Sequence, residues 1–287
     1  MKAVRNYLEL IKFEHTIFAL PFAYLGMLLA ANGFPSFAQF FWITVAMAAA
    51  RTVAMGFNRI ADRAYDARNP RTANRPLVTG AISISTAWGG TLIAVGVLTL
   101  AAWQLSAMTL HLLPIALLFL FGYSFTKRFT WLSHFILGFT DGLAPVGAWV
   151  AIRGSLFTPQ DIPAWILLAV VTFWIGGFDL IYACKDIEID REIGIKSIPA
   201  RFGPPAALRL SAISHIVTIL LLVELGILTD LSWPYWLGMV VTAALLYWEH
   251  SLVSPQDLSR INMAFFNINS YISVTLFVSM LVALYIG

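Results

Sequence analysis

Apolar stretches of about twenty residues recur from one end of this 287-residue chain to the other. A helix rises about 1.5 Å per residue, so a helix of about twenty residues crosses the hydrocarbon core of a bilayer. The chain is 59% hydrophobic and its mean hydropathy is +0.79, which is too apolar for a soluble domain of this size. We therefore predict an all-α membrane protein with a single polytopic domain over residues 1–287, because no long polar segment leaves room for another domain.

Nine transmembrane helices account for these apolar runs. We expect the spans at residues 16–32, 38–57, 83–103, 107–124, 131–152, 162–182, 205–228, 233–249 and 265–286. The first run follows Lys2, Arg5 and Lys12, as the core of a signal peptide would. Glu9 and Glu14 in the same segment argue against a signal peptide, so we keep the segment as the first span.

The basic residues divide unequally between the two sides of the predicted membrane. Of the 18 Lys and Arg residues, all but Arg51 and Arg153 fall on one side, since Arg51 lies within a span and Arg153 on the other side. The positive-inside rule then places the N-terminus in the cytoplasm and the C-terminus outside. The net charge of +3 could suggest a nucleic-acid partner, but the basic residues lie between spans, so we expect none.

Two polar stretches, at residues 58–76 and 179–194, follow the second and sixth spans and hold much of the charge. A helix turns about 100° per residue, so the oxygen-bearing residues of each stretch share one helix face. These are Asn58, Asp62 and Asp66 in the first stretch, and Asp179, Asp186 and Asp190 in the second. Carboxylates grouped in this way repel one another unless a cation lies between them.

Magnesium suits two such faces, because it commonly takes one or two carboxylates together with phosphate oxygens. For a single stretch the alternative is that the aspartates form ordinary ion pairs with Arg59, Arg63 and Arg68. The matching acid spacing of the two stretches favours the metal.

Cations beside the acidic faces suit a phosphorylated ligand. Arg71 and Arg75 lie four residues apart, and a guanidinium can bind phosphate oxygens through two hydrogen bonds. Tyr123 and Lys127, also four apart, leave the fourth span on the same side. A diphosphate bridged to the acids by magnesium and flanked by these groups would be neutralised. The alternative is that such residues only set the topology, and for Arg128 we prefer that interpretation.

Three ionisable residues lie inside predicted spans, where each costs about 2.5–3.5 kcal/mol at the middle of a bilayer. Arg51 precedes Asn58 by seven residues, two helical turns, so we expect it to point into the same cavity. Asp141 either lines a cavity or pairs with an arginine, and Glu224 has no motif around it. The histidines show no metal-binding spacing, and the single Cys184 excludes an internal disulfide.

Together these motifs resemble the UbiA superfamily of intramembrane prenyltransferases. The similar motifs are Asn58-x-x-x-Asp62-x-x-x-Asp66, Arg71-Thr-x-x-Arg75-Pro-Leu, Tyr123-Ser-x-x-Lys127, Asp186-x-x-x-Asp190 and Gly194-Ile-Lys-Ser197. The resemblance covers essentially the whole chain. It implies transfer of a polyprenyl chain from its diphosphate to an aromatic acid such as 4-hydroxybenzoate, in ubiquinone or menaquinone biosynthesis. Many members have Asp after the first Asn, where this chain has Arg59, and the exact acceptor therefore stays open.

The resemblance also implies a role for each candidate residue. Magnesium would be held by Asn58, Asp62, Asp66, Asp186 and Asp190. The substrates would be bound by Arg51, Asn58, Arg71, Arg75, Tyr123 and Lys127. The catalytic carboxylates would be Asp62, Asp66, Asp179, Asp186 and Asp190, with Asp179 or Asp190 taking the ring proton. For Arg51 two accounts stay open, a clamp on the acceptor carboxylate and a structural pair with Asp141.

The expected partners are the two substrates and the lipid bilayer, with the active site on the cytoplasmic face of the plasma membrane, the inner membrane of a bacterium. The alternative function is a secondary transporter of an anionic metabolite, which the buried charge and a faint internal repeat would fit. Against it, the charges gather at the cytoplasmic end of the spans and not at the midplane, where a transporter binds its substrate.

Overall fold

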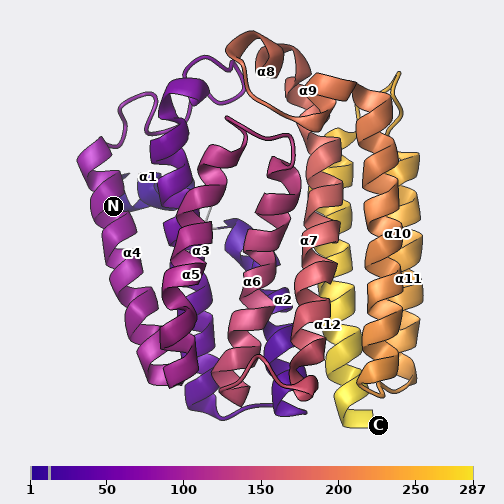
Figure 1. Ribbon diagram of the computed structural model, residues 1–287. Coiled ribbons are helices and arrows are strands. Elements are labelled where there is room, and N and C mark those ends of the chain that lie inside the picture. The colour runs from indigo at the N-terminus through magenta and orange to yellow at the C-terminus, as the bar shows by residue number, and fades with distance from the viewer. Residues whose placement is uncertain (1, 12–13, 287) are drawn as a thin grey trace.

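The computed structural model describes residues 2–11 and 14–286, and in that part of the chain every regular element is helical (Figure 1). Lys12 lies outside the described residues, and so do the side chains of Lys2, Arg5 and Glu14. The α-helices are α1 Lys2–Leu10, α2 Glu14–Ala31, α3 Phe37–Asp66, α4 Ile84–Leu105, α5 Ala107–Thr126, α6 Ser133–Arg153, α7 Ile162–Ala183, α8 Ile187–Ile193, α9 Ile198–Phe202, α10 Pro204–Leu228, α11 Trp233–Ser251 and α12 Asn269–Ile286. Two 3₁₀ turns, Pro159–Asp161 and Cys184–Asp186, and a π-helix, Met263–Ile268, complete the fold.

Each expected span coincides with a long helix. Within the described residues, seven helical segments are long and apolar enough to cross a membrane, namely α3, α4, α5, α6, the segment Pro159–Ile193, α10 and the segment Met263–Ile286. The helices α2 and α11 are not among the seven, and the apolar part of α2 is the shorter Leu20–Ala31. The count of nine spans therefore stays a prediction. The outward faces carry exposed Leu118, Ile216 and Val240, as a lipid-facing surface would.

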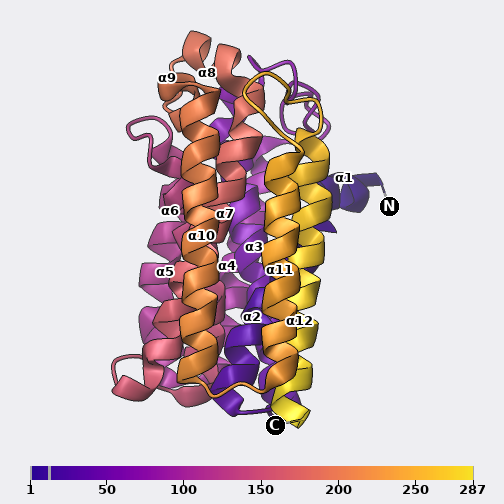
Figure 2. The same ribbon diagram turned by 90° about the vertical axis from the view of Figure 1, so that its right-hand side faces the viewer.

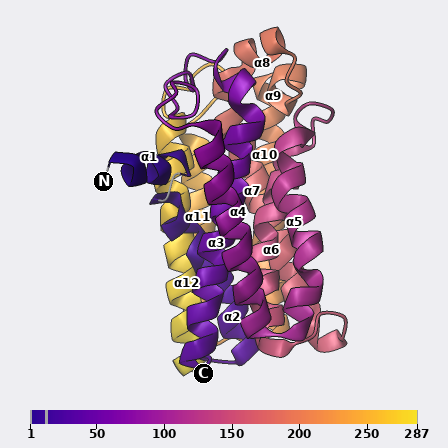
Figure 3. The same ribbon diagram turned by 90° about the vertical axis from the view of Figure 1, so that its left-hand side faces the viewer.

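The long helices run side by side along one axis of the molecule (Figures 1 and 2). In the first part of the chain α3 packs against α4 and α5, and α5 in turn packs against α6. Helices α3 and α4 face the viewer in Figure 3. In the second part α7 packs against α10, and α11 against α12. The two parts meet where α6 lies against α7, and α2 closes the bundle by packing on both α6 and α12. The polar stretches lie with α8 and α9 at one end, opposite the C-terminus (Figure 1).

The first polar stretch begins on α3, as the spacing predicts. Ser36 starts this helix with a capping box, in which its side chain accepts from the Gln39 amide and the Gln39 side chain accepts from the Ser36 amide. The helix then runs for 30 residues and ends at Asp66, so Asn58, Asp62 and Asp66 share one helix.

The second polar stretch is not one helix, and the prediction of a single face there was wrong. Helix α7 ends at Ala183, a 3₁₀ turn covers Cys184–Asp186, and α8 ends before Gly194, whose φ of 78° is a left-handed helix stop. A 3₁₀ turn holds about three residues per turn. The rotation of about 100° per residue that applies along α7 therefore no longer applies to the residues after Ala183. Asp179 therefore belongs to the long helix, whereas Asp186 and Asp190 belong to the turn and to α8.

Helices α6 and α7 approach each other closely at a glycine. Gly138 on α6 is buried, and a Cβ atom on it would overlap the backbone carbonyl of Thr172 on α7. Because a backbone group cannot move aside as a flexible side chain can, the absence of a side chain at this position sets the spacing of the two helices.

We expect Gly138→Ala to lower the free energy of unfolding by about 1–3 kcal/mol, as overpacking a well-packed contact does. Gly147 on the same helix has no neighbour within 4 Å of an added Cβ, which makes Gly147→Ala the matched control. That change should leave the stability unaltered or raise it by up to about 1 kcal/mol. Thermal unfolding of both variants in detergent measures the difference, and equal losses would contradict the assigned role of Gly138.

Candidate active site

A polar cavity of about 700 Å³ opens at the end of the bundle that carries α8 and α9. Its walls come from the ends of α3, α5 and α7, the start of α6, and the segments that follow α3 and α8. All predicted site residues except Arg51 line it, namely Asn58, Asp62, Asp66, Arg71, Arg75, Tyr123, Lys127, Asp179, Asp186 and Asp190. Segments more than a hundred residues apart in sequence thus meet in one cavity.

Asp62 lies at the α3–α5 wall of the cavity with a side chain that is only 2% exposed. Its Oδ2 accepts from Asn58 Nδ2 at 3.0 Å and from Lys127 Nζ. Its Oδ1 is buried and has no hydrogen-bond partner among the described residues, although Arg128 Nη2 lies 3.8 Å away. Arg128, for which we preferred a role in topology alone, also stacks over the rings of Tyr65 and Phe125.

Asp66 is bound by the segment that follows its own helix. Arg75 Nη1 donates to Asp66 Oδ2 at 2.6 Å. The ordinary ion pairs considered as an alternative for this stretch are not formed by Arg59 and Arg63. Arg59 Nε donates to the Leu10 carbonyl and Arg63 Nε to the Leu77 carbonyl. Asp66 and Asp62 are thus bound by Arg75 and Lys127, two of the cations that the sequence motifs had assigned to a diphosphate.

Asp186 connects the second polar stretch to the first. Arg71 donates to it through two bonds, Nε to Oδ1 at 3.0 Å and Nη2 to Oδ2 at 2.6 Å, and Asn69 Nδ2 adds a third at 3.1 Å. Burial by itself lowers the pKa of the Arg71 guanidinium, but its hydrogen bond and charge interaction with Asp186 outweigh burial, so the pKa is raised. The Arg71 guanidinium therefore stays protonated at any ordinary pH.

The remaining two carboxylates have neutral or histidine partners. Ser197 Oγ donates to Asp190 Oδ2 at 3.0 Å, and Asp190 is 8% exposed. Asp179 Oδ2 lies 2.7 Å from His134 Nδ1. This role of His134 could not be predicted from the sequence, because the two residues lie 45 positions apart and no local motif surrounds the histidine. Asn69 and Ser197, by contrast, stand inside the motif segments and could have been named from them.

Aromatic rings form the wall next to Asp186. Tyr182 stacks on Phe265 with ring centroids 4.1 Å apart, and Phe266 also lines the cavity. Both phenylalanines lie in the π-helix Met263–Ile268. Asn269 Nδ2 donates to the Ala264 and Phe265 carbonyls at 3.1 Å each, so a side chain adds hydrogen bonds to the backbone of this segment.

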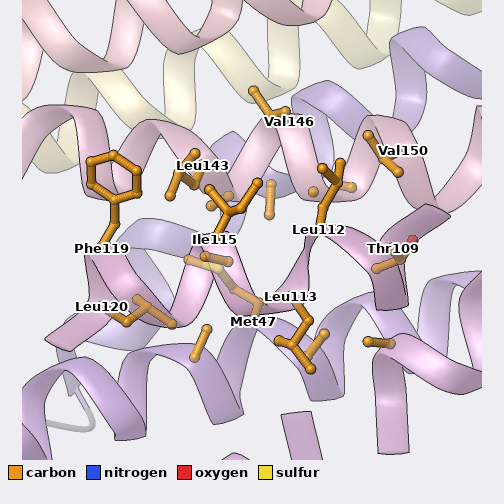
Figure 4. Close-up of a pocket in the computed structure, with 18 of the residues that line it drawn as sticks. Met47, Thr109, Leu112, Leu113, Ile115, Phe119, Leu120, Leu143, Val146 and Val150 are labelled. Atoms are coloured by element: carbon orange, nitrogen blue, oxygen red, sulfur yellow. The ribbon is translucent and has the colours of Figure 1, made fainter. Parts of the chain in front are cut away.

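A second, apolar cavity of about 300 Å³ lies deeper in the bundle between α3, α5 and α6. Met47, Leu112, Phe119 and Leu143 are among its lining residues (Figure 4). Apolar side chains from three helices therefore surround a space large enough for several isoprene units or an aromatic ring.

Arg51 lines this apolar cavity and not the polar one, so the prediction that it shares a cavity with Asn58 was wrong. Arg51 and Asn58 are seven residues apart on α3, which amounts to about 10 Å along the helix axis. This separation places the two residues at different depths in the bundle. Its Nη1 lies 3.8 Å from Asp141 Oδ1 on α6, which is the contact that the structural account of Arg51 requires. Between the two levels the Tyr123 hydroxyl donates to the Ala54 carbonyl at 3.1 Å.

The oxygen donors around the polar cavity fit a hard divalent cation such as Mg²⁺. No three His, Cys, Asp or Glu side chains of the described chain already converge at ligand distance. The carboxylates instead hold Lys127, Arg75 and Arg71. The unpartnered, buried Oδ1 of Asp62 is an acceptor that the protein itself leaves unused, as a metal ligand would be before binding.

Comparison with known proteins decides the family. The model of the UbiA prenyltransferase family matches residues 19–271. The 4-hydroxybenzoate octaprenyltransferase of Pseudoalteromonas translucida is 31% identical over 258 residues, which cover 90% of this chain and 86% of that protein. The chain belongs to the UbiA prenyltransferase family. The enzyme of the same name from Edwardsiella ictaluri is 34% identical over 227 residues, 79% of this chain and 77% of that protein.

Solved structures share the fold of this prenyltransferase. A UbiA homolog from Aeropyrum pernix superposes with a TM-score of 0.86 at 33% identity, covering 94% of this chain and 98% of that one. A UbiA homolog from Archaeoglobus fulgidus bound to DMAPP and Mg²⁺ superposes with a TM-score of 0.66 at 19% identity, covering 94% and 99%. At that lower identity the likeness concerns the fold alone.

We expect Lys127→Met to lower the free energy of unfolding by about 1–3 kcal/mol, because it leaves the buried Asp62 carboxylate without its closest cation. Adding Asp62→Asn should restore most of this loss, since the uncompensated charge is removed with it. Lys196→Met, an exposed lysine at the same end of the bundle, is the control and should change little. Thermal unfolding in detergent gives the comparison; a double variant no more stable than Lys127→Met would argue against this pairing.

Proposed function

We propose that this prenyltransferase moves a polyprenyl chain from polyprenyl diphosphate to an aromatic acid of the 4-hydroxybenzoate type, as a step of ubiquinone or menaquinone biosynthesis. The observation that carries the proposal is the set of carboxylates and cations that α3, α5 and α7 bring around one polar cavity. The names of the relatives support the acceptor class. The Archaeoglobus fulgidus homolog bound to DMAPP and Mg²⁺ supports the donor class and the metal.

In this proposal the diphosphate takes over the cations that now hold the carboxylates. Arg71, Arg75 and Lys127 would turn to its oxygens, and a guanidinium offers two donors to each phosphate. The carboxylates so released, Asp62, Asp66, Asp186 and Asp190, would hold Mg²⁺ together with Asn58. The metal would neutralise the charge that develops on the departing diphosphate. Tyr123 would add a hydroxyl to the leaving group only after giving up its bond to Ala54.

The allylic C–O bond then breaks, and the diphosphate leaves with the electron pair. The rings of Tyr182, Phe265 and Phe266 line the cavity, and aromatic faces stabilise a nearby cation when water is excluded. The ring carbon ortho to the acceptor hydroxyl attacks the allylic carbon, and a carboxylate of the cavity, Asp179 or Asp190, takes the ring proton.

The apolar surroundings fit a prenyl substrate. The prenyl tail would lie along apolar surface and leave sideways into lipid. This exit would explain why the enzyme is a membrane bundle, which we propose to form one domain. Nine spans with the polar end in the cytoplasm agree with the positive-inside rule and would place the C-terminus outside. At the opposite end Arg153 Nε lies 3.9 Å from the buried Asp161 carboxylate, so this basic residue is locally compensated.

The deciding experiment uses the purified, detergent-solubilised protein with Mg²⁺, one labelled prenyl diphosphate and a panel of aromatic acids. We expect a prenylated acid, with no product once a chelator has removed the metal. A secondary transporter needs a sealed vesicle and makes no product, so the absence of any transfer with every acid would favour the transporter instead.

We expect Asp62→Asn and Asp190→Asn each to reduce turnover at saturating Mg²⁺ by more than about tenfold, because each removes a charged metal ligand. The protein should still insert and fold, as size-exclusion profiles would verify. Asp257→Asn, an exposed acid in a loop, is the matched control and should keep its activity. Near-normal turnover in either cavity variant would exclude a metal site built from both motifs.

We expect Arg51→Lys to raise the KM of the aromatic acid strongly and to leave that of the prenyl diphosphate nearly unchanged, because a planar guanidinium suits a carboxylate. A purely structural Arg51 would affect both substrates alike and lower the thermal stability. In that case the Arg51→Leu, Asp141→Leu double variant would regain what Arg51→Leu loses, since the stranded Asp141 charge would be gone. Steady-state kinetics and unfolding of the three variants separate the accounts.

A further inference from the structure

Asp179 differs from the other carboxylates of the polar cavity in its partner. Asp62, Asp66 and Asp186 each hold a lysine or an arginine, and Asp190 accepts from a serine hydroxyl. Within the described part of the chain, the partner of Asp179 is the imidazole of His134, at 2.7 Å. About a quarter of the Asp179 side chain remains exposed to the cavity, at 24%. Asp179 is therefore an oriented carboxylate that no fixed cation neutralises.

The surroundings of His134 define which nitrogen carries the proton. The side chain is 4% exposed, and its Nε2 is buried without a hydrogen-bond partner among the described residues. A buried N–H without an acceptor is rarer and costlier than a buried lone pair without a donor. The proton therefore belongs on Nδ1, and the imidazole donates to Asp179 Oδ2.

The closeness of α6 and α7 holds this pair in place. His134 is the second residue of α6, and Gly138, where the α6 backbone approaches the Thr172 carbonyl of α7, lies one helical turn further on. Asp179 stands on the same α7 two turns beyond Thr172. With the helix spacing set by backbone contact, neither side chain can withdraw from the other without a change of rotamer.

The depth of the pair matches the place where the acceptor ring must lie. Asp179 lies four residues before the last residue of α7, about 6 Å toward the middle of the bundle. Asp141, the partner of Arg51, follows His134 on α6 by seven residues. The pair thus lies between the phosphate-binding end and the Arg51–Asp141 level. An aromatic acid that spans these levels would pass its ring alongside Asp179.

We propose that Asp179 is the carboxylate that removes the ring proton and that His134 is the residue that positions it; this rests on the proposed function. After the new C–C bond forms, the ring C–H bond breaks, its electron pair restores the aromatic ring, and the proton moves to the free oxygen of Asp179. The hydrogen bond from His134 keeps the other oxygen turned away and so aims the accepting one at the ring. Asp190, which is more buried and bound to Ser197, is left to the metal.

The test is a kinetic isotope effect with 4-hydroxybenzoate deuterated at both ring positions ortho to the hydroxyl. In the wild type we expect the ratio of the kcat with unlabelled 4-hydroxybenzoate to the kcat with the deuterated acid to be close to unity. Asp179→Asn should reduce kcat by about 10²- to 10⁴-fold, the usual loss for a general base, and raise the isotope effect because proton removal becomes limiting. The KM of the prenyl diphosphate should change little.

The histidine series provides the second measurement. His134→Ala should reduce kcat by about tenfold with a raised isotope effect, as loss of an orienting hydrogen bond predicts. His134→Asn keeps a donor near the position of Nδ1. This variant should therefore recover most of the wild-type kcat and most of the wild-type isotope effect. Asp161→Asn, a buried acid at the opposite end, tests for a merely structural effect and should lower stability with no isotope effect.

An isotope effect that stays at unity in Asp179→Asn and His134→Ala, with product still formed by the wild type, would overturn this inference and leave the proposed function intact. No prenylated acid from the wild type would overturn the proposed function and this inference with it. A raised isotope effect in Asp190→Asn but not in Asp179→Asn would move the role to Asp190.

Discussion

The two hydrogen bonds from Arg71 to Asp186 join the two polar stretches, and the rest of the site depends on that contact. Arg71 follows α3 and Asp186 lies in the turn after α7, so the pair closes the cavity between segments 115 residues apart in sequence. Lys127 bound to Asp62 ties α5 to α3 in the same way. Each of these charges would be costly in a low-dielectric bundle without its partner, and each partner comes from another segment. Packing of the long helices and pairing of the charges therefore require each other.

The sequence allowed the first half of the site to be predicted, because Asn58, Asp62 and Asp66 stand at a spacing of four on a helix that continues unbroken to Asp66. It did not allow the same for the second half. A change from α to 3₁₀ geometry at Cys184 leaves no mark in residue spacing, and it alters the direction of every later side chain. Pattern counting thus identified residues that do line the cavity, but it placed them on the wrong local structure.

The depth of a residue in the bundle and the contacts between distant residues could not be predicted from the sequence, for a different reason. Arg51 and Asn58 lie on the same helix α3, but only the structure shows that they line separate cavities. The contact of His134 with Asp179 arises from the close approach of α6 and α7, which depends on Gly138 meeting a backbone carbonyl of another helix. Glycine at one position and a carbonyl 34 residues later form no recognisable motif. The positions of the long helices, set by hydrophobic runs, were predictable throughout.

The ion pairs in the cavity have a thermodynamic consequence. A cation that arrived alone and bound the paired oxygens of Asp62, Asp66 or Asp186 would displace a lysine or arginine and leave that basic group unsatisfied. A phosphate group that arrived alone would draw the same basic group away and leave the carboxylate bare. Together the two proposed ligands would satisfy both halves of each broken pair, so each would raise the affinity for the other by the same factor. In the proposed function, the paired charges of the cavity would therefore favour binding of metal and diphosphate as a unit.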